Sequence, residues 1–524
     1  METLLASLTS REGPGAALAV RRLDGATWRG FQGLADLENR VPIGPSTRFH
    51  VASVSKQFTA YAALRLAAAG RLDMDGELGA YLPELPEFDQ AISLSQMAWH
   101  VSGLKDQWAL LTLGGRDWGD VLNQARILRL VARVPELDFA PGSAYAYSNT
   151  NYTLLAEIVQ RVSGAPFWRH MRDEVFAPRG MSNTVVYDDV TAVLTSRAQS
   201  YTADGQGGWK RSILSYANFG ATSVHTTVDD LLTWGGYLLR PPAADQALAS
   251  QMLAQGRLND GAAIAYGHGL IHDQLGGHEA FVHSGNDAAF NAYFAIVPAA
   301  GLCVAVTANT RMDVRKLADE MVRIVAGAGE HQPRRTTRSS ASAGELAGVY
   351  VGGAMGQCLF VVDTPPGVER RLAPGVSGTP LTAVDGELVR LDADVRLRPR
   401  RDAGGAVTGL EETDASNPFH PTKTLWRRVG ASAPKPARLQ QLVGEWRSGP
   451  LDITYRLDVV DGQLVISDLW GARRVILLAT DQDRFDGADG VLRTLQIIRG
   501  ADGDVDHITL STGRARGLRF DRAA

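Results

Sequence analysis

The hydrophobic pattern of this 524-residue chain changes near residue 330, and this change limits what the chain can fold into. Between Gly13 and Ala326, short apolar runs alternate with long segments of helical periodicity, which indicates one large unit of helices and strands. Beyond it, short alternating segments separated by Gly, Asp and Pro are typical of antiparallel barrels or sandwiches. Because one core rarely serves more than about 300 residues, several domains are expected.

Two polar segments divide the chain further. Residues 331–344 and 431–437 contain proline and charged or small residues and lack apolar periodicity, as linkers do. We therefore predict three domains, at residues 1–330, 345–430 and 438–524.

A short repeat marks the beginning of the last two predicted domains. Leu-Ala-Gly-Val-Tyr at 346–350 recurs as Leu-Val-Gly-Glu-Trp at 442–446. Two unrelated strands can also share so short a pattern. The repeat favours two similar β domains.

The composition excludes some classes of partner. The chain is 45% hydrophobic and 21% charged, with a formal net charge of −4, so no basic field is available for nucleic acid or an anionic membrane. No apolar run of about 18 residues occurs, and the N-terminus lacks the basic region of a secretory signal. We expect a cytoplasmic protein that acts on a small peptide, amide or ester, with a homodimer as one candidate assembly.

The candidate chemistry begins with a Ser-x-x-Lys tetrad. The chain has three of them, and chance alone produces about one in this length. The tetrad at 102–105 contains a glycine and the tetrad at 432–435 lies in a linker. Only Ser53 and Lys56 lead directly into a strong helix former, residues 57–66, where residues three apart share one face.

A serine hydroxyl needs a neighbouring base before it attacks a carbonyl, and a lysine removed from water can be that base. The alternative is an N-capping serine beside a solvated lysine. Tyr147 and Asn149 form a Tyr-x-Asn pattern in a turn-rich segment before a helical run, so a phenol base and a substrate-binding amide are candidates there. A second Tyr-x-Asn at 216–218 is a competitor.

His283 and Gly285 end a predicted strand as His-x-Gly. Glycine lets a substrate backbone lie against a strand, and the histidine can supply a hydrogen bond or partial positive charge. An ordinary edge-strand histidine is the alternative. His268 and His272 have helical metal-ligand spacing, but the glycines around them make a poor helix, and we predict no metal and no cofactor.

Taken in order, these three motifs resemble those of the penicillin-recognising serine hydrolases of the class C β-lactamase-like branch. Further stretches, at 100–104, 139–142 and 223–230, also look like that branch. The resemblance covers about residues 14–326. It implies a β-lactamase-like domain, with an antiparallel sheet flanked by helices plus an all-α subdomain.

The histidine of the third motif and the two β domains together resemble the bacterial D-aminopeptidases. This resemblance implies two antiparallel lipocalin-like barrels, the last of which sends a loop to the substrate's amine. The site residues it implies are Ser53 as nucleophile, Lys56 and Tyr147 as proton carriers, Asn149, His283, Gly285 and Asp468 as substrate binders, and the N–H groups of Ser53 and Asn286 as oxyanion hole.

The stretch that carries Asp468 departs from the family because it contains the adjacent arginines Arg473 and Arg474. Such a pair suits an acidic group better than an ammonium. Cleavage of small amides or peptides with a D-residue is the leading hypothesis. An esterase is the first alternative, D,D-carboxypeptidase or β-lactamase activity the second, and a binding or sensory module without turnover the third.

Overall fold

The computed structural model divides the chain into two compact units, which are described separately. The first contains residues 1–104 and 117–332, and the second contains residues 105–116 and 333–524. The structure describes residues 4–5, 10–116, 120–327, 343–352, 357–364, 367–371, 378–384, 387–390, 395–414, 422–429, 436–468, 473–489 and 491–523.

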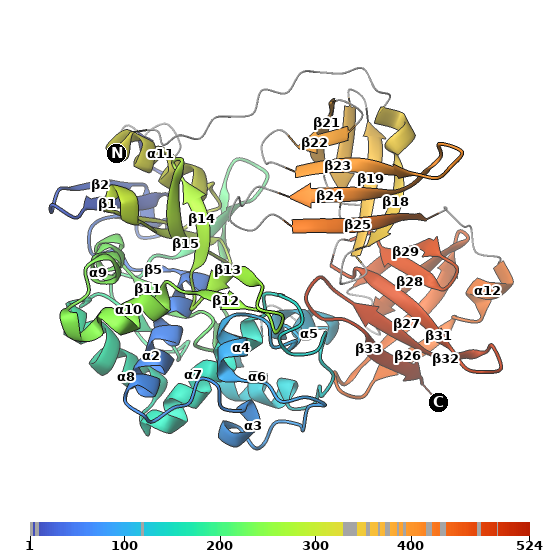
Figure 1. Cartoon of the computed structure of the whole chain (residues 1–524), viewed down its shortest axis with the longest axis horizontal. Helices are drawn as coiled ribbons and strands as arrows, with labels where there is room; N and C mark the ends of the chain where they lie inside the picture. The colour runs from blue at the N-terminus through green and yellow to red at the C-terminus, as the bar shows by residue number, and fades with distance from the viewer. Residues whose placement is uncertain are drawn as a thin grey trace. The chain divides into compact units, whose positions relative to one another are not determined.

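An eight-stranded antiparallel sheet forms the centre of the first unit (Figure 1). Its order is β12 (Gln255–Arg257), β13 (Ala263–Gly267), β14 (Ile271–Leu275), β15 (His278–Asp287), β16 (Phe290–Val297), β17 (Leu302–Ala308), β1 (Ala16–Arg22) and β2 (Thr27–Gln32). Every residue of β16 and β17 is buried, so both faces of the sheet are covered.

One face of the sheet packs against helix α11 (Val314–Ala326), whose Leu317 and Met321 join the buried side chains of Leu18 and Val304. The opposite face receives α9 (Val228–Leu239). Its Gly235 lies so close to Cys303 that an added Cβ would be 2.9 Å from the Cys303 sulfur. The alternation of side chains along each strand provides both apolar faces.

The rest of the first unit is mainly helical, with several two- and three-stranded sheets. Helices α2 (Lys56–Ala68) and α7 (Asn149–Ser163) lie against each other in it. The remaining elements are β3 (Leu34–Asp36), β4 (Val41–Pro42), β5 (Phe49–His50), η1 (Ala52–Ser55), α3 (Leu78–Tyr81), α4 (Leu94–Ala98), β6 (Leu122–Asn123), α6 (Gln124–Val131), α8 (Phe167–His170), η2 (Met171–Phe176), η3 (Ala177–Arg179), β7 (Val185–Val186), β8 (Ser200–Ala203), β9 (Trp209–Ser212), β10 (Tyr216–Ala217), β11 (Val224–Thr226), η4 (Ala243–Asp245), α10 (Gln246–Met252) and η5 (Pro298–Ala300).

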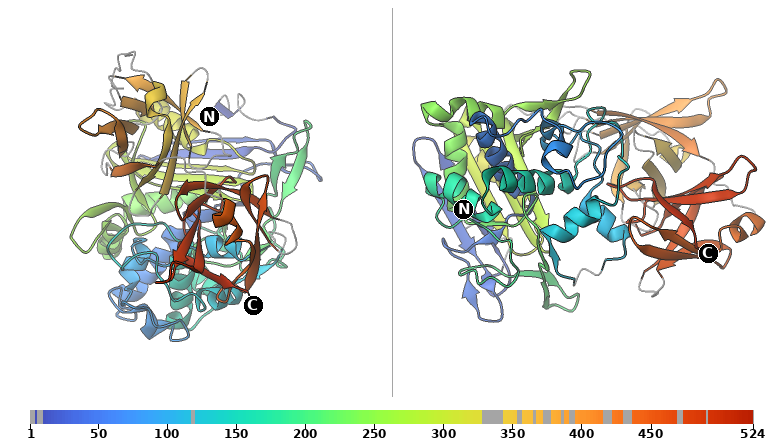
Figure 2. Two further views of the ribbon diagram at one scale, coloured as in Figure 1. Left: turned by 90° about the vertical axis from the view of Figure 1, so that its right-hand side faces the viewer. Right: turned by 90° about the horizontal axis from the view of Figure 1, so that it is seen from below.

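The second unit contains two closed eight-stranded antiparallel barrels, and Figure 2 shows the strands of the second one, in red, arranged around its interior. The predicted fold class, a β-lactamase-like domain followed by two antiparallel barrels, is therefore confirmed. Before the first barrel lies η6 (Ala343–Leu346); the barrel is β18 (Gly348–Gly352), β19 (Gln357–Thr364), β20 (Gly367–Arg371), β21 (Thr379–Val384), β22 (Glu387–Arg390), β23 (Val395–Arg401), β24 (Val407–Asp414) and β25 (Thr422–Val429). After α12 (Pro436–Gln440), the second is β26 (Gly444–Ser448), β27 (Ile453–Val460), β28 (Gln463–Asp468), β29 (Arg474–Asp481), β30 (Arg484–Gly487), β31 (Thr494–Arg499), β32 (Val505–Ser511) and β33 (Leu518–Arg522).

The repeated motif has the same local role in both barrels. The Tyr350 hydroxyl donates to the Leu346 carbonyl at 2.8 Å, and the Trp446 indole N–H donates to the Leu442 carbonyl at 2.9 Å. Each ring also lies under an arginine of the last strand of its barrel. The buried aromatic residue thus fixes the entry of the chain into each barrel.

A short segment that the sequence places in the first domain packs with the second barrel. It is residues 105–116, which include helix α5 (Gln107–Leu113). The Asp106 N–H donates to the Arg514 carbonyl at 2.9 Å, and the Tyr455 hydroxyl donates to the Leu113 carbonyl at 2.9 Å. Removing residues 437–524 would therefore also strip this segment of its partners.

Candidate active site

Ser53 lies in the short 3-10 helix η1, immediately before α2. Ala52 before it has a φ of 48°, a left-handed conformation that costs free energy in a residue with a Cβ and often occurs at functional sites. Ser53 is half-buried, whereas Lys56 is 0% exposed. The Lys56 ammonium donates to the Ser53 hydroxyl oxygen at 2.9 Å, a distance at which a proton can transfer between them.

Two further acceptors hold the Lys56 ammonium. Asn149, the first residue of α7, accepts through Oδ1 at 2.9 Å, and the Ala221 carbonyl accepts at 2.8 Å. With Ser53 these acceptors match the three N–H bonds of an ammonium group. The packing of α2 on α7 therefore fixes the direction in which Lys56 meets the serine.

Tyr147 lies beside Lys56. The centre of its ring is 4.9 Å from the Lys56 nitrogen, and the side chain is half-buried. The ring also lies 4.3 Å from that of His100 and 6.3 Å from that of His283, measured between centres. The structure thus brings Tyr147 together with Ser53 and Lys56 from two separate segments of the chain.

His283 is buried on β15 with both ring nitrogens in hydrogen bonds to the protein. The Ser284 carbonyl can only accept, so Nδ1, 2.6 Å away, carries the proton. Nε2 then accepts from the Tyr266 hydroxyl at 3.0 Å. Burial, assisted by the Lys56 charge, lowers the pKa of His283 to about 3, so the positive charge that the sequence allowed is absent near neutral pH.

This shift predicts a pH-dependent stability. An unfolded histidine has a pKa of about 6.5, so between pH 3 and 6.5 the unfolded chain binds a proton that the folded chain does not. The free energy of unfolding therefore falls as the pH drops below 6.5, by about 2 kcal/mol at pH 5 for this group. Urea titrations at pH 7 and pH 5 measure this effect. Between these two pH values, the free energy of unfolding of His283→Asn should fall by about 2 kcal/mol less than that of the unmodified chain.

The matched control is His278→Asn, because His278 is partly exposed on the same strand. Comparing two pH values for each variant cancels the constant cost of leaving the Tyr266 hydroxyl without its acceptor. An equal pH dependence in the His283 variant and in the unmodified chain would contradict the prediction.

Gly285 lies where β15 meets the turn before Ser53. A Cβ added to it would be 2.1 Å from the Val51 carbonyl oxygen and 3.3 Å from the Ala52 Cβ, so only glycine fits. Asn286 follows Gly285, just as Ser53 follows Ala52. The close approach thus places the segment that contains Asn286 against the segment that contains Ser53, and an oxyanion hole formed by their N–H groups stays a prediction.

Gly285→Ala should therefore displace β15 from η1. We expect kcat to fall by about 10- to 100-fold, because small displacements of oriented groups have effects of this size. Gly236→Ala in α9 is the control, since a Cβ there meets nothing within 4 Å, and it should leave kcat unchanged. A Gly285→Ala enzyme with unchanged kcat would show that the approach does not position reacting groups.

Comparisons with known proteins identify the family. The family model described as Beta-lactamase matches residues 2–328, more than half of the chain. The chain belongs to the beta-lactamase family. It is an enzyme, a serine hydrolase of this family, and the predicted resemblance is confirmed.

Individual relatives in this family include D-aminopeptidases. The chain is 26% identical over 386 residues to a D-aminopeptidase of Gluconobacter oxydans, covering 72% of each chain. It is 29% identical over 287 residues to a D-aminopeptidase of Brucella anthropi, covering 54% of each, so it spans about half the length of that relative.

Solved structures share the fold. D-amino acid amidase of Ochrobactrum anthropi SV3 matches with a TM-score of 0.53 at 23% identity, over 62% of this chain and 96% of that one. SurE matches with a TM-score of 0.51 at 19% identity, over 100% of this chain and 97% of that one. The likeness to SurE thus extends through the barrels that follow the beta-lactamase domain.

Asp468 lies at the end of β28, in the other unit from Ser53. Its carboxylate accepts from the Arg473 N–H at 3.1 Å, and its own N–H donates to the Arg473 carbonyl at 3.2 Å. Residues 469–472 between them lie outside the described residues. A substrate contact by Asp468 stays a prediction.

The residues of the alternative sequence patterns form hydrogen bonds elsewhere in the first unit. Asn218 of the second Tyr-x-Asn donates to the Thr153 hydroxyl at 3.4 Å. A ring nitrogen of His268 lies 2.8 Å from the Gln251 carbonyl, and one of His272 lies 2.9 Å from that of Leu253. Within the described ranges, no group of three or more His, Cys, Asp or Glu is arranged to hold a metal ion.

The sequence analysis did not predict the role of His100 in the candidate active site. His100 Nδ1 accepts from the Ser148 N–H at 3.2 Å and lies 3.1 Å from Nδ2 of Asn151, while Ser102 donates to Asn151 at 2.6 Å. These bonds hold the segment that carries Tyr147. The only sequence signal was the stretch at 100–104, which the resemblance included without a role.

No helix in the described ranges is long and apolar enough to cross a membrane.

Proposed function

We propose that this serine hydrolase forms an acyl-enzyme at Ser53 and acts as a D-aminopeptidase-like enzyme on small amides or peptides, releasing N-terminal D-residues. The observation that carries the proposal is the buried Lys56 ammonium, 2.9 Å from the Ser53 oxygen and held by Asn149 and Ala221. A solvated lysine beside an N-capping serine would not need two further fixed acceptors. The D-aminopeptidase relatives support the substrate class.

In the proposed reaction, the pair formed by Lys56 and Tyr147 starts with one proton fewer than an ammonium and a phenol together. The Ser53 oxygen attacks the substrate carbonyl and its proton passes to this pair. The N–H groups of Ser53 and Asn286 receive the negative oxygen. The pair then protonates the amine, which leaves as the C–N bond breaks. Water attacks the ester and gives its proton to the same pair, which passes it to the Ser53 oxygen as the C–O bond breaks and the acid is released.

Substrate orientation in this proposal depends on the groups around the pair. The Oδ1 atom of Asn149 accepts a hydrogen bond from Lys56. The Nδ2 atom of the same amide is therefore the group proposed to donate to a substrate carbonyl. His283 acts by holding Tyr266 beside the site. Asp468, in the last barrel, is proposed to meet the ammonium of the substrate.

Two assays test the proposal. An active-site serine phosphonate, followed by peptide mapping, should modify Ser53, and modification elsewhere or none would refute the acyl-enzyme. The D- and L-alanyl p-nitroanilides are then compared with p-nitrophenyl acetate. Preference for the D-anilide supports the aminopeptidase, whereas ester cleavage without turnover of either anilide would favour an esterase.

A further inference from the structure

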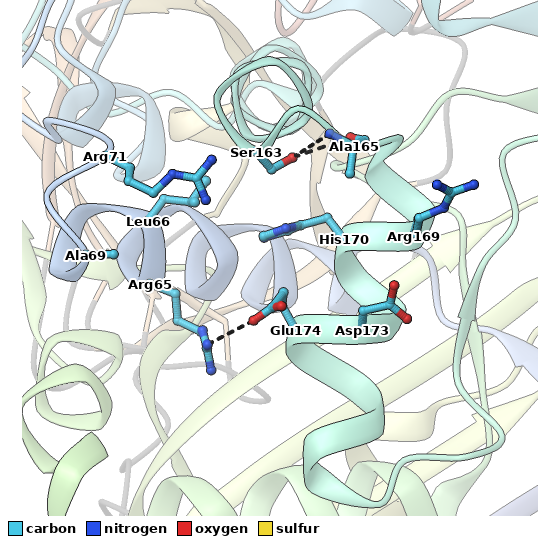
Figure 3. A pocket seen from close by; sticks show the side chains of 10 residues that line it. All are labelled: Arg65, Leu66, Ala69, Arg71, Ser163, Ala165, Arg169, His170, Asp173 and Glu174. Atoms are coloured by element: carbon cyan, nitrogen blue, oxygen red, sulfur yellow. Dashed lines mark hydrogen bonds and ion pairs between the residues drawn. The ribbon is translucent and has the colours of Figure 1, made fainter.

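The first unit contains a polar cavity of about 300 Å³ at the far ends of the two helices that begin at the active site. Helix α2 begins with Lys56 and contributes Arg65 to the wall of the cavity, and α7 begins with Asn149 and contributes Ser163 (Figure 3). At 1.5 Å per residue these distances are roughly 14 and 21 Å along the helices. The cavity is thus separate from the site around Ser53.

His170 at the end of α8 lines this cavity with a polar atom that lacks a partner. It is 8% exposed, and its Nε2 has no hydrogen bond among the described residues. Figure 3 shows the ring reaching from α8 toward α2. Buried polar groups are nearly always satisfied, so an orphaned nitrogen in the wall of a cavity indicates a polar occupant.

The carboxylates of the cavity are already paired. Glu174 is 3.1 Å from the Arg65 guanidinium, and Asp173 is 2.6 Å from that of Arg172, which lies outside the lining. A bound ammonium would have to compete with these guanidinium groups. A cation or zwitterion is therefore disfavoured.

Two arginines that line the cavity differ from Arg65, which is paired with a carboxylate. Arg71 donates to the Val162 carbonyl at 2.6 Å, whereas Arg169 stacks on the Trp168 ring and its guanidinium points away from Arg71 and His170 (Figure 3). In the part of the chain that the structure describes, neither forms an ion pair with a carboxylate. Guanidinium groups match the geometry of phosphate and carboxylate oxygens, with which they form two hydrogen bonds at once.

We propose that this cavity binds a small molecule that carries a phosphate or carboxylate group, held by Arg71 and His170. Its volume reaches the lower range of known small-molecule sites and exceeds what a bare oxyanion fills, so the group belongs to a larger organic ligand. The site lies where α2 and α7 end, and the same helices hold Lys56 and Asn149 in contact.

Binding is tested on the full chain with Ser53→Ala, which removes turnover and makes the result independent of the proposed reaction. Inorganic phosphate and acetate are titrated by calorimetry at constant ionic strength. We expect saturable binding of at least one of them, weakened tenfold or more by Arg71→Gln and changed little by Arg169→Gln. Arg129→Gln, an exposed arginine outside the cavity, is the control and should bind as tightly as the parent.

The variants are chosen so that a folding defect is distinguishable from lost binding. Glutamine at 71 keeps an N–H donor but not the charge, and each variant's Tm is measured. His170→Asn provides a second test and should also weaken binding. No saturable binding of either anion, or binding by the Arg71→Gln variant as tight as that of the parent with an unchanged Tm, would overturn the proposal.

Discussion

Replacing Ser53 with alanine is expected to lower kcat/KM by about 10⁴- to 10⁶-fold, the range found when the nucleophile of a serine hydrolase is removed. The fold should survive, because Ser53 is half-buried and Lys56 keeps two other acceptors, Asn149 and Ala221. The measurement is steady-state hydrolysis of a p-nitrophenyl ester, together with phosphonate labelling and peptide mapping.

Ser55→Ala is the matched control, two residues away in the same helical turn. The Ser55 oxygen accepts from the Val224 N–H at 3.1 Å, so its loss leaves that buried group unsatisfied and should cost about 1–3 kcal/mol of stability. Its activity per folded molecule should stay within a few fold of the unmodified enzyme. A Ser53→Ala enzyme that is still labelled by the phosphonate would disprove the assignment of the nucleophile.

The second large effect is expected from Lys56→Met. Methionine fills a similar volume but neither carries a proton between Ser53 and Tyr147 nor donates to Asn149 and Ala221. We expect the rate of Ser53 acylation to fall by about 10²- to 10⁴-fold, the usual contribution of a general base. Stopped-flow acylation measures this step separately from release of the acid.

Lys105→Met is the control for Lys56, because Lys105 ends the second Ser-x-x-Lys tetrad and is also buried. Its ammonium donates to the Arg516 carbonyl at 2.5 Å. Removing it should lower stability, with less than about a tenfold effect on acylation. Equal losses of acylation rate in the two variants would mean that the Lys56 effect comes from structure and not from proton transfer.

Deleting the last barrel is a poor test of its role, since residues 105–116 pack with it. Replacing only residues 469–472 is a better test of that role, because it leaves the hydrogen bond between the Tyr455 hydroxyl and the Leu113 carbonyl in place.

Much of this enzyme could be predicted from local sequence. The Ser53 and Lys56 pair depends only on helical spacing, because residues three apart share a face wherever a helix forms. The barrels follow from alternating strands with frequent turns, and the repeated aromatic at 350 and 446 marks where each begins. These features have short-range causes, which the sequence carries directly.

Tertiary structure decided what depends on contacts between distant segments. It selected Asn149 over Asn218, since only packing determines which amide reaches Lys56. It also explains why position 285 must be glycine, which the sequence analysis did not find. A Cβ at Gly285 would lie 2.1 Å from the Val51 carbonyl oxygen. The tetrad of Ser53 and Lys56 is one of three in the sequence, and it differs from the others because residues about 90 and 165 positions later supply the acceptors that fix its lysine.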